Sequence, residues 1–245
     1  MKENGMELDA IAARYEARKT AGADQRYSWS KPDVYMSAME GDRAMLDLFT
    51  AAGLLDFARL RLIEIGCGSG GNLLRLLRWG FDPANLVGNE LLPERLAAAR
   101  RRLPQDVALI GGDACELGCE GFDIVYQSTV FSSILDEDFQ KRLAKRMWEM
   151  AKPGGGILWY DFCYDNPRNP DVRGVPVRRI RALFPSTQVV VRRVTLAPPL
   201  ARVVTRVSAG LYSVFNSLPL LRTHALCWIP KPVGCGGNAE IRDLL

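Results

Sequence analysis

Short apolar runs alternate with longer segments of helical periodicity along most of this chain. Two helices are predicted near the start, over residues 7–19 and 33–52, with an aromatic link that ends in proline between them. From residue 61 the pattern predicts five strands, at 62–65, 85–90, 107–110, 122–127 and 155–162. The segments between these strands predict helices at 73–79, 93–103 and 136–151. This alternation is typical of βαβ units, so we expect a doubly wound, mostly parallel α/β sheet.

A looser pattern follows residue 162. A short helix is predicted at 177–184, and two further strands are predicted at 188–196 and 223–229. The segment between these strands, 197–222, is too long for a hairpin turn, and its apolar residues recur mostly at three- and four-residue steps. We therefore expect it to be helical with one apolar face. Its uncharged run, 207–221, is too short and too polar to span a bilayer.

The composition fits one large α/β domain. The 245 residues are 48% apolar and 24% charged, which is ordinary for a globular protein. The six cysteines form no CxxC pair, so we expect reduced thiols and a cytoplasmic location, and we predict no metal site. The first ten residues lack the apolar core of a secretory signal, so we expect no such signal.

Charge is unevenly distributed along the chain. Residues 166–235 carry eleven Arg or Lys and one acid, a net charge of +10, whereas the remaining residues carry 21 basic and 27 acidic groups. This asymmetry favours an anionic molecule as the partner of the basic part. The alternative is a basic surface that faces solvent alone.

A glycine-rich turn follows the strand predicted at 62–65. Its sequence is Glu64-Ile65-Gly66-Cys67-Gly68-Ser69-Gly70-Gly71, and an acid, Glu90, ends the next predicted strand. Glycine lets such a turn approach a ligand closely, and ligands of doubly wound sheets bind outside the carboxyl ends of the strands. The turn also fits the G-x-G-x-x-G pattern of nicotinamide cofactor sites, so a nicotinamide-dependent oxidoreductase stays open as an alternative.

The order of further motifs resembles that of the class I methyltransferases, which use S-adenosylmethionine. After the glycine-rich turn come residues 87–95 with Glu90, then Asp113-Ala114, Phe122-Asp123-Ile124-Val125 and Lys152-Pro153-Gly154-Gly155. A nicotinamide enzyme does not account for Asp113-Ala114 or for the Pro-Gly-Gly turn. The resemblance covers about residues 60–163. It implies a Rossmann-like sheet of seven strands with an antiparallel last strand and an N-terminal helical cap.

The resemblance also implies a division of the chain and a set of cofactor contacts. Residues 1–56 would form the cap, 57–235 the core with a lid insertion at 197–222, and 236–245 a tail. The implied cofactor is S-adenosylmethionine, whose methionine part would lie on the backbone of Gly66, Cys67, Gly68 and Gly70, near Glu64. Its ribose and adenine would contact Glu90, Leu91, Asp113 and Ala114, and Gln127 would lie beside the methionine or the sulfonium.

The flanks resemble bacterial methyltransferases of polysaccharide or secondary-metabolite biosynthesis, chiefly in residues 127–134, 158–162, 169–175 and 221–224. This implies a small-molecule acceptor, such as a hydroxyl of a saccharide, a lipid-linked glycan or a secondary metabolite. N-methylation and a binding module without turnover remain alternatives. Nucleic-acid bases are disfavoured, because Gln127-Ser128-Thr129-Val130 stands where methyltransferases of base amino groups carry D/N-P-P-Y/F.

Three residues are expected to face one crevice on the acceptor side. In class I methyltransferases the antiparallel strand begins at the edge where the parallel strands end, which places His224 near Tyr160 and Asp161. His224, the single histidine, is the first candidate for a general base and Asp161 the second, and each has a structural role as its alternative. The predicted substrate contacts are Tyr27, Trp29, Tyr160 and Arg173.

Two segments are candidate covers of the acceptor. The aromatic residues Tyr27, Trp29 and Tyr35 would form an N-terminal lid, or else pack in the core. The insertion 197–222 would be a second lid, a plain surface helix, or an interfacial helix that meets a lipid-linked acceptor at a membrane. The oligomeric state is left open.

Overall fold

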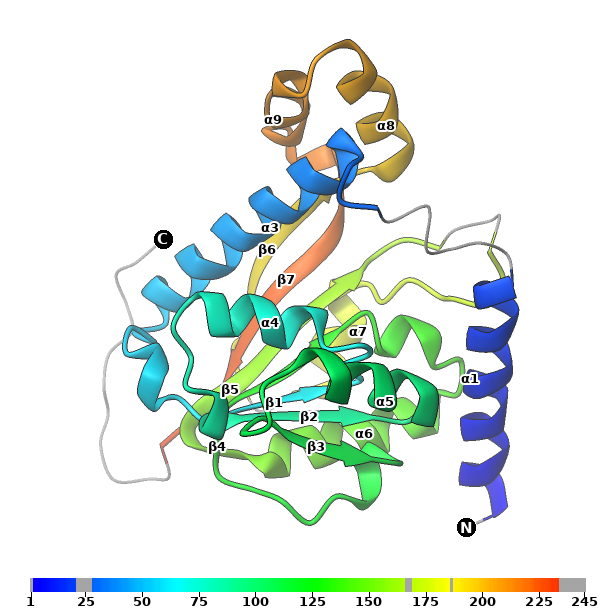
Figure 1. The fold of residues 1–245 in the computed structure, drawn as a ribbon, viewed down its shortest axis with the longest axis vertical. Coiled ribbons are helices and arrows are strands. Elements are labelled where there is room, and N and C mark those ends of the chain that lie inside the picture. The colour runs from blue at the N-terminus through cyan, green and yellow to red at the C-terminus, as the bar shows by residue number, and fades with distance from the viewer. Residues whose placement is uncertain (1, 21–27, 166–168, 186, 234–245) are drawn as a thin grey trace.

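The computed structural model describes residues 2–20, 28–165, 169–185 and 187–233. They form a seven-stranded sheet covered by helices on both faces (Figure 1). The strands are β1 (Leu62–Ile65), β2 (Leu86–Glu90), β3 (Ala108–Gly111), β4 (Phe122–Ser128), β5 (Ala151–Phe162), β6 (Val190–Leu196) and β7 (Arg222–Pro230). Their order across the sheet is β3-β2-β1-β4-β5-β7-β6.

The strand directions confirm the predicted fold class. β1 pairs in parallel with β2 and β4, and parallel pairing continues from β2 to β3 and from β4 to β5. β7 runs antiparallel to both β5 and β6. The start of β7 therefore lies at the edge where the parallel strands end, and His224 is the register partner of Phe162.

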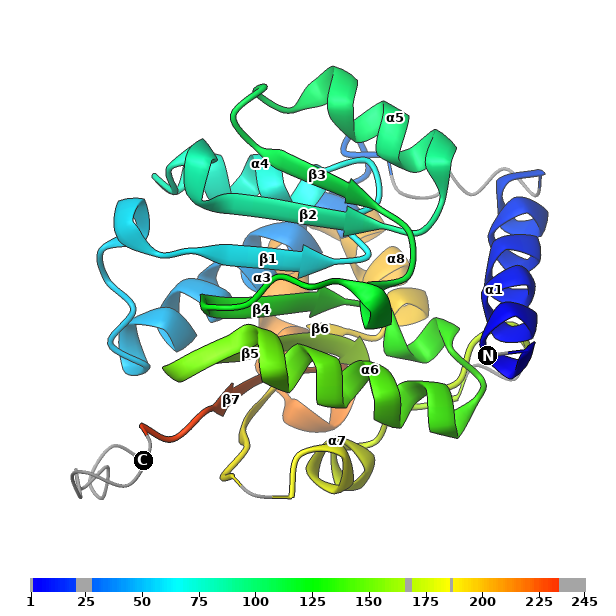
Figure 2. The ribbon, with the colours of Figure 1, turned by 90° about the horizontal axis from the view of Figure 1, so that it is seen from below.

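Helices cover the two faces of the sheet with separate apolar cores. They are α1 (Lys2–Thr20), α3 (Pro32–Ala51), α4 (Gly71–Arg78), α5 (Pro93–Arg102), α6 (Glu137–Met150), α7 (Val177–Leu183), α8 (Pro198–Val207) and α9 (Gly210–Asn216). One core joins α6 and α7 to the sheet, and the other joins α3, α4 and α5 to its opposite face. Figure 2 shows α6 in front of the sheet and α3 behind it.

The second helix packs on the sheet, and the division of the chain into a cap at 1–56 and a core stays a prediction. Met45, Leu48 and Phe49 of α3 are buried in the same apolar cluster as β1 and β4. The residues recur at helical spacing, so one face of α3 is apolar and packs on the sheet. α1 lies at the carboxyl ends of the strands (Figure 1), and its Ile11 is buried in the core that joins α6 to the sheet.

The insertion between β6 and β7 is helical, as predicted, but consists of two helices. Ser208, after α8, has an extended backbone (φ −158°, ψ 135°), and α9 starts two residues later. Ala201, Val204 and Tyr212 form a small core of their own with Leu196 at the end of β6. Within the described residues, no helix is long and apolar enough to cross a membrane.

Candidate active site

The glycine-rich turn joins β1 to α4 in a conformation that requires glycine. Gly66 and Gly68 have φ angles of +66° and +59°, in the left-handed region that β-carbons disfavour. A Cβ at Gly66 would lie 2.6 Å from Cγ2 of Val130, and one at Gly68 would lie 2.7 Å from Nη2 of Arg95. The backbone of this turn is thus tightly surrounded by side chains from two other segments.

The carboxylate of Glu90 is fixed at the end of β2 by backbone donors. Gly68 N donates to its Oε2 (2.7 Å) and Leu92 N donates to its Oε1 (3.0 Å). Each carboxylate oxygen can accept more than one hydrogen bond, so lone pairs remain for a ligand. Glu90 therefore couples the glycine-rich turn to the start of α5 and offers an oriented acceptor to a hydroxyl pair.

The end of β3 presents a second acid and a backbone donor. Cys115 N donates to Oδ1 of Asp113 (2.9 Å), which caps the short helix η3 (Ala114–Glu116). Because Ala114 is the first residue of η3, no carbonyl of that helix can accept its N–H. Asp113 and Ala114 thus offer an acceptor and a donor side by side, as the resemblance implied for an adenine ring.

Glu64 is a buried acid with an unsatisfied oxygen. Asn72 Nδ2 donates to its Oε1 (2.6 Å), whereas Oε2 has no partner among the described residues. Burial raises the pKa of Glu64 to about 7. A buried carboxylate oxygen without a donor is costly, and an ammonium group of a ligand would satisfy it.

A cavity connects Glu90 with the end of β3, whereas Glu64 is buried outside its lining. Gly66, Glu90, Leu91, Asp113 and Ala114, half of the predicted cofactor residues, line it. Its volume is about 70 Å³. The strand ends and the turn therefore form one concave site, as expected for a doubly wound sheet.

Several lining residues of this cavity were not predicted. Leu8, Ile11 and Tyr15 of α1 cover it, and Arg95 lies against the ring of Tyr15, with Cζ 4.9 Å from the ring centroid. Leu8, Ile11 and Tyr15 recur at helical spacing, so the sequence could predict that they share one face of a helix. Nothing in the pattern indicated which part of the protein that apolar stripe would cover.

Polar contacts hold α1 over the cavity. Glu7 Oε1 accepts hydrogen bonds from Leu135 N (3.0 Å) and from Arg14 Nη2 (2.7 Å). Arg14 Nη2 also donates to Ser133 O (3.2 Å), at the end of the short helix η4 (Phe131–Ser133). We call Glu7 and Arg14, with their hydrogen bonds to Leu135 N and Ser133 O, the α1 latch.

Three predicted cofactor residues have other local roles. Cys67 N donates to Asn89 O (2.8 Å), and its side chain is buried in the core with α3 and α4. A Cβ at Gly70 would lie 2.7 Å from Leu103. Gln127, fully buried, accepts from Val130 N (3.0 Å) and donates to Tyr160 O (3.4 Å). These residues shape the turn and the end of β4, and none of them lines the cavity.

On the acceptor side, Tyr160 and His224 form a stacked pair. Their ring centroids are 5.1 Å apart at an interplanar angle of 15°, and Phe162 meets His224 edge-on. Thr223 Oγ1 lies 3.0 Å from Nδ1 of His224. Burial lowers the pKa of His224 to about 4, so its imidazole is neutral at physiological pH.

The expectation that Asp161 faces the same crevice as Tyr160 and His224 is wrong. Successive side chains of a strand point to opposite faces, and Asp161 follows Tyr160 in β5. Its carboxylate is fully buried and accepts from Ser132 N (3.1 Å) and Phe162 N (3.0 Å). Burial raises the pKa of Asp161 to about 7. This geometry is that of a residue that anchors η4 to β5.

Tyr160 is held at both ends by strained residues. Thr129 N donates to Tyr160 O (2.8 Å), and Thr195 Oγ1 lies 2.9 Å from the phenolic oxygen. Thr129 and Thr195 have φ angles of +58° and +64°, and no other non-glycine residue in the described part of the chain has a positive φ. Such strain in β-branched residues is rare and concentrates at functional sites.

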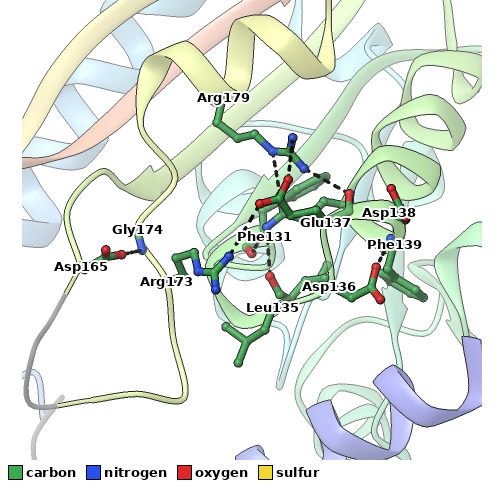
Figure 3. Close-up of polar contacts among 12 residues, drawn as sticks. Phe131, Leu135, Asp136, Glu137, Asp138, Phe139, Asp165, Arg173, Gly174 and Arg179 are labelled. Atoms are coloured by element: carbon green, nitrogen blue, oxygen red, sulfur yellow. Dashed lines mark hydrogen bonds and ion pairs between the residues drawn. The ribbon is translucent and has the colours of Figure 1, made fainter. Parts of the chain in front are cut away.

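The remaining predicted substrate residues are more exposed. Trp29 lies in the turn before α3 with 60% of its surface exposed, and Tyr27 lies outside the described residues. Figure 3 shows Arg173 and Arg179 on opposite sides of Glu137. The closest Arg173–Glu137 contact is 3.8 Å, whereas Arg179 also donates to Glu137 O and to Gln140 Oε1. Arg179 thus braces α6 to α7, and Arg173 keeps an exposed charge near η4.

Comparison with known sequences identifies the domain type. A family described as a methyltransferase domain matches residues 62–155. The trans-aconitate 2-methyltransferase of Afipia carboxidovorans is 30% identical over 131 residues, which are 53% of this chain and 48% of that protein. The chain therefore spans about half the length of the curated relative that it matches.

Solved structures share the fold at low sequence identity. An S-adenosylmethionine-dependent methyltransferase from Mesorhizobium loti matches with a TM-score of 0.55 and 16% identity over 74% of this chain and 96% of that chain. Magnesium protoporphyrin IX methyltransferase from Synechocystis PCC 6803, solved with bound SAH, matches with a TM-score of 0.57 and 12% identity over 81% and 85%. A methyltransferase-domain family thus matches residues 62–155, and the strand order of the sheet is similar to that of class I S-adenosylmethionine-dependent methyltransferases.

Proposed function

We propose that the protein transfers the methyl group of S-adenosylmethionine to a small anionic molecule, at a hydroxyl oxygen. The observation that carries the proposal is the cavity at the glycine-rich turn, with Glu90 and Asp113 at its wall. Both acids are oriented by backbone donors and keep lone pairs free. Reduced cysteines and a cytoplasmic location are part of the same proposal.

The residues present fit this cofactor. Glu90 would accept from the ribose hydroxyls, and Asp113 and the Ala114 N–H would contact adenine. Glu64 does not line the cavity, but it lies in β1, which leads into the glycine-rich turn, and its unsatisfied Oε2 would accept from the ammonium. When bound, S-adenosylmethionine supplies a methyl group activated by a positively charged sulfur. The chain's own residues then have to orient the acceptor, exclude water and take up one proton.

His224 is the best-placed group for that proton on the acceptor side. Its imidazole is neutral, because burial lowers its pKa to about 4, and a neutral imidazole nitrogen can accept a proton from a hydroxyl. Stacking on Tyr160 and the contact of Thr223 with Nδ1 fix the ring, which leaves Nε2 for the acceptor. Arg173, exposed near η4, would attract an anionic group.

The cofactor assignment is tested with S-adenosylhomocysteine and the variant Glu90→Ala. We expect calorimetry to show binding to the wild type and a loss of about 1–3 kcal/mol in the variant, because hydrogen bonds to a charged acceptor disappear. Glu94→Ala, an exposed acid in the first turn of the same α5, is the matched control and should bind normally. Binding of NAD and none of S-adenosylhomocysteine would favour the nicotinamide alternative.

Turnover identifies the acceptor class. The protein is incubated with methyl-labelled S-adenosylmethionine and a panel that contains trans-aconitate, sugar phosphates, small amines and cell extract. The curated relative is named for trans-aconitate, a tricarboxylate, and this makes carboxylates a natural first choice for a basic site. Label in an ether supports the proposal, label in an ester assigns methylation to a carboxylate oxygen instead of a hydroxyl, and label in an amine supports N-methylation. Tight cofactor binding without any labelled product would mark a binding module.

A further inference from the structure

The insertion between β6 and β7 leaves apolar side chains in solvent. Twelve large apolar residues are exposed in the described part of the chain, and five of them lie in this one segment: Val203, Val207, Val214, Leu218 and Leu220. Val207 is 79% exposed and Leu220 is 94% exposed. Such a concentration on one element is unusual for a surface that meets only water.

These residues are exposed although the insertion is well packed. Tyr212 of α9 is fully buried and accepts a hydrogen bond from Leu196 N (3.3 Å), and Arg222 Nε donates to Asn216 O (2.6 Å). Ser213 Oγ also lies 3.3 Å from Oε1 of Glu40 in α3. The inner faces of α8 and α9 therefore have their partners, and the five exposed residues, which lie in α8, in α9 and in the turn after α9, form a second, outer apolar set.

Basic residues accompany the outer apolar set. Arg202 and Arg206, one turn apart in α8, are both exposed beside Val203 and Val207. The sequence has no acid from residue 172 to residue 239, so the insertion carries positive charge alone. A face of valines and leucines between arginines is complementary to a surface that is both apolar and negatively charged.

Aromatic residues extend the same end of the molecule. Trp29 and Tyr35 are exposed at the N-terminal end of α3, the end against which α8 and α9 pack (Figure 1). Met36, one residue further, already contacts the core of the insertion. Trp and Tyr are favoured where one part of a side chain is apolar and the other is hydrated, as at a bilayer surface.

We propose that the outer face of α8 and α9, with Trp29 and Tyr35, docks on the surface of an anionic lipid bilayer. An interfacial helix pair of this kind needs no transmembrane span. Both ends of the insertion lie at the edge where His224 pairs with Phe162, so docking brings the acceptor side to the membrane. The inference rests on the proposed function and narrows the acceptor to an anionic molecule carried by, or released at, a membrane.

The test is sedimentation of the full chain with vesicles. Vesicles of phosphatidylcholine with 30 mol% phosphatidylglycerol are compared with pure phosphatidylcholine, from low to high salt. We expect binding to the anionic vesicles that weakens as salt rises, because screening reduces the attraction of the arginines. Val207→Asp with Leu220→Asp should abolish sedimentation. Arg202→Gln with Arg206→Gln should weaken it about twenty-fivefold, at about fivefold for each charge.

Matched controls separate docking from unfolding. Leu55→Asp changes an exposed leucine (68%) beyond the other end of α3, and Arg100→Gln with Arg101→Gln removes two exposed charges from α5. Both controls should sediment like the wild type. Each variant must keep its thermal midpoint and its affinity for S-adenosylhomocysteine, so a failed cofactor site is recognised independently of docking.

Three results would overturn the inference. The wild type stays in the supernatant with anionic vesicles, or the Val207→Asp, Leu220→Asp variant sediments unchanged. In the third, the wild type is a dimer in solution and the Val207→Asp, Leu220→Asp variant is a monomer. The face would then bind a second copy of the chain. Loss of sedimentation in the outer-face variants, with retention in both controls, supports membrane docking.

Discussion

At the scale of single residues, the buried Glu64 carries a cost in stability that its proposed role in binding would explain. The free protein buries a carboxylate whose Oε2 has no donor among the described residues, and this raises the pKa of Glu64 to about 7. A ligand ammonium would reverse that shift, because an adjacent cation favours the ionised carboxylate. The unpaired oxygen is thus the feature expected of a site that is complete only with its ligand.

The variant Glu64→Gln separates the two effects. At pH 8 we expect the ligand-free variant to be more stable than the wild type, by about 1–3 kcal/mol, because a neutral amide replaces a buried charge. Its affinity for S-adenosylhomocysteine should fall about tenfold to a hundredfold, since the charged acceptor is gone. Urea unfolding and calorimetry measure the two quantities. A variant that loses stability while it binds normally contradicts the assignment.

His224 provides a prediction about pH and rate. Because the pKa of its imidazole is about 4, the proton-accepting form predominates at any higher pH. The rate with a hydroxyl acceptor should therefore show no fall between pH 8 and pH 5 that is due to this group. His224→Ala should lower the rate roughly 10²- to 10⁴-fold and leave cofactor affinity unchanged.

A structural role for His224 would give a different result. The variant would then lose thermal stability and cofactor affinity together, with little change in the rate of the fraction that stays folded. Since His224 is the single histidine of the chain, its imidazole signal in NMR directly reports its pKa. A midpoint near 6.5 would show that the ring is hydrated, and the argument from burial would then fail.

At the scale of elements, α1 is a cover over the cofactor cavity. The α1 latch has few polar contacts, and the helix otherwise contributes Leu8, Ile11 and Tyr15 to the cavity wall. A ligand in this cavity would contact these three side chains. The latch should therefore affect rates of exchange more than it affects the fold of the domain.

Glu7→Ala tests this role of α1. Loss of the carboxylate removes the acceptor for Leu135 N and for Arg14, and we expect S-adenosylhomocysteine to dissociate about fivefold to tenfold faster. Asp9→Ala, on the same helix and exposed, is the control and should leave the rate unchanged. Stopped-flow displacement measures both. Equal dissociation rates in the Glu7→Ala variant and the wild type would show that α1 does not limit release.

The elements of the site differ in how well the sequence predicts them. Glu90 and Asp113 could be placed because each ends a strand, and strand ends meet at one edge of a parallel sheet. The error at Asp161 has a physical cause. β5 lies inside the sheet with helices on both faces, so its apolar run gives no alternation that would tell which residues face which layer.

Contacts between distant segments were less predictable. Arg95 and Tyr15 meet over the cavity from α5 and α1, and Val130 closes on Gly66 from the loop after β4. Each depends on the length and direction of a side chain after the helices have packed. The break between α8 and α9 at Ser208 similarly depends on how the two helices pack around the buried side chain of Tyr212. Local periodicity carries no information about such contacts.

At the scale of the whole molecule, three buried groups should determine how stability depends on pH. Burial raises the pKa of both Glu64 and Asp161 to about 7, and lowers that of His224 to about 4. The folded protein keeps the protons of Glu64 and Asp161 to a higher pH than the unfolded chain does. Ionisation of these two groups therefore lowers the stability of the fold as pH rises toward 7. For the lowered pKa of His224, stability is lost instead as pH falls from 6.5 toward 4.

The two carboxyl groups outweigh the single imidazole, so the ligand-free protein should be more stable at pH 5 than at pH 8. The expected difference in the free energy of unfolding is on the order of 2–3 kcal/mol. Glu64→Gln should lose about half of the contribution from the carboxyl groups. Saturation with S-adenosylhomocysteine should also reduce the difference, because its ammonium would keep Glu64 ionised at both pH values. Urea unfolding at the two pH values measures this difference for the wild type, for Glu64→Gln and for the ligand-bound protein. A ligand-free wild type that is more stable at pH 8 would mean that Glu64 and Asp161 titrate as exposed acids do, and the unpaired oxygen of Glu64 would then be hydrated rather than reserved for a ligand.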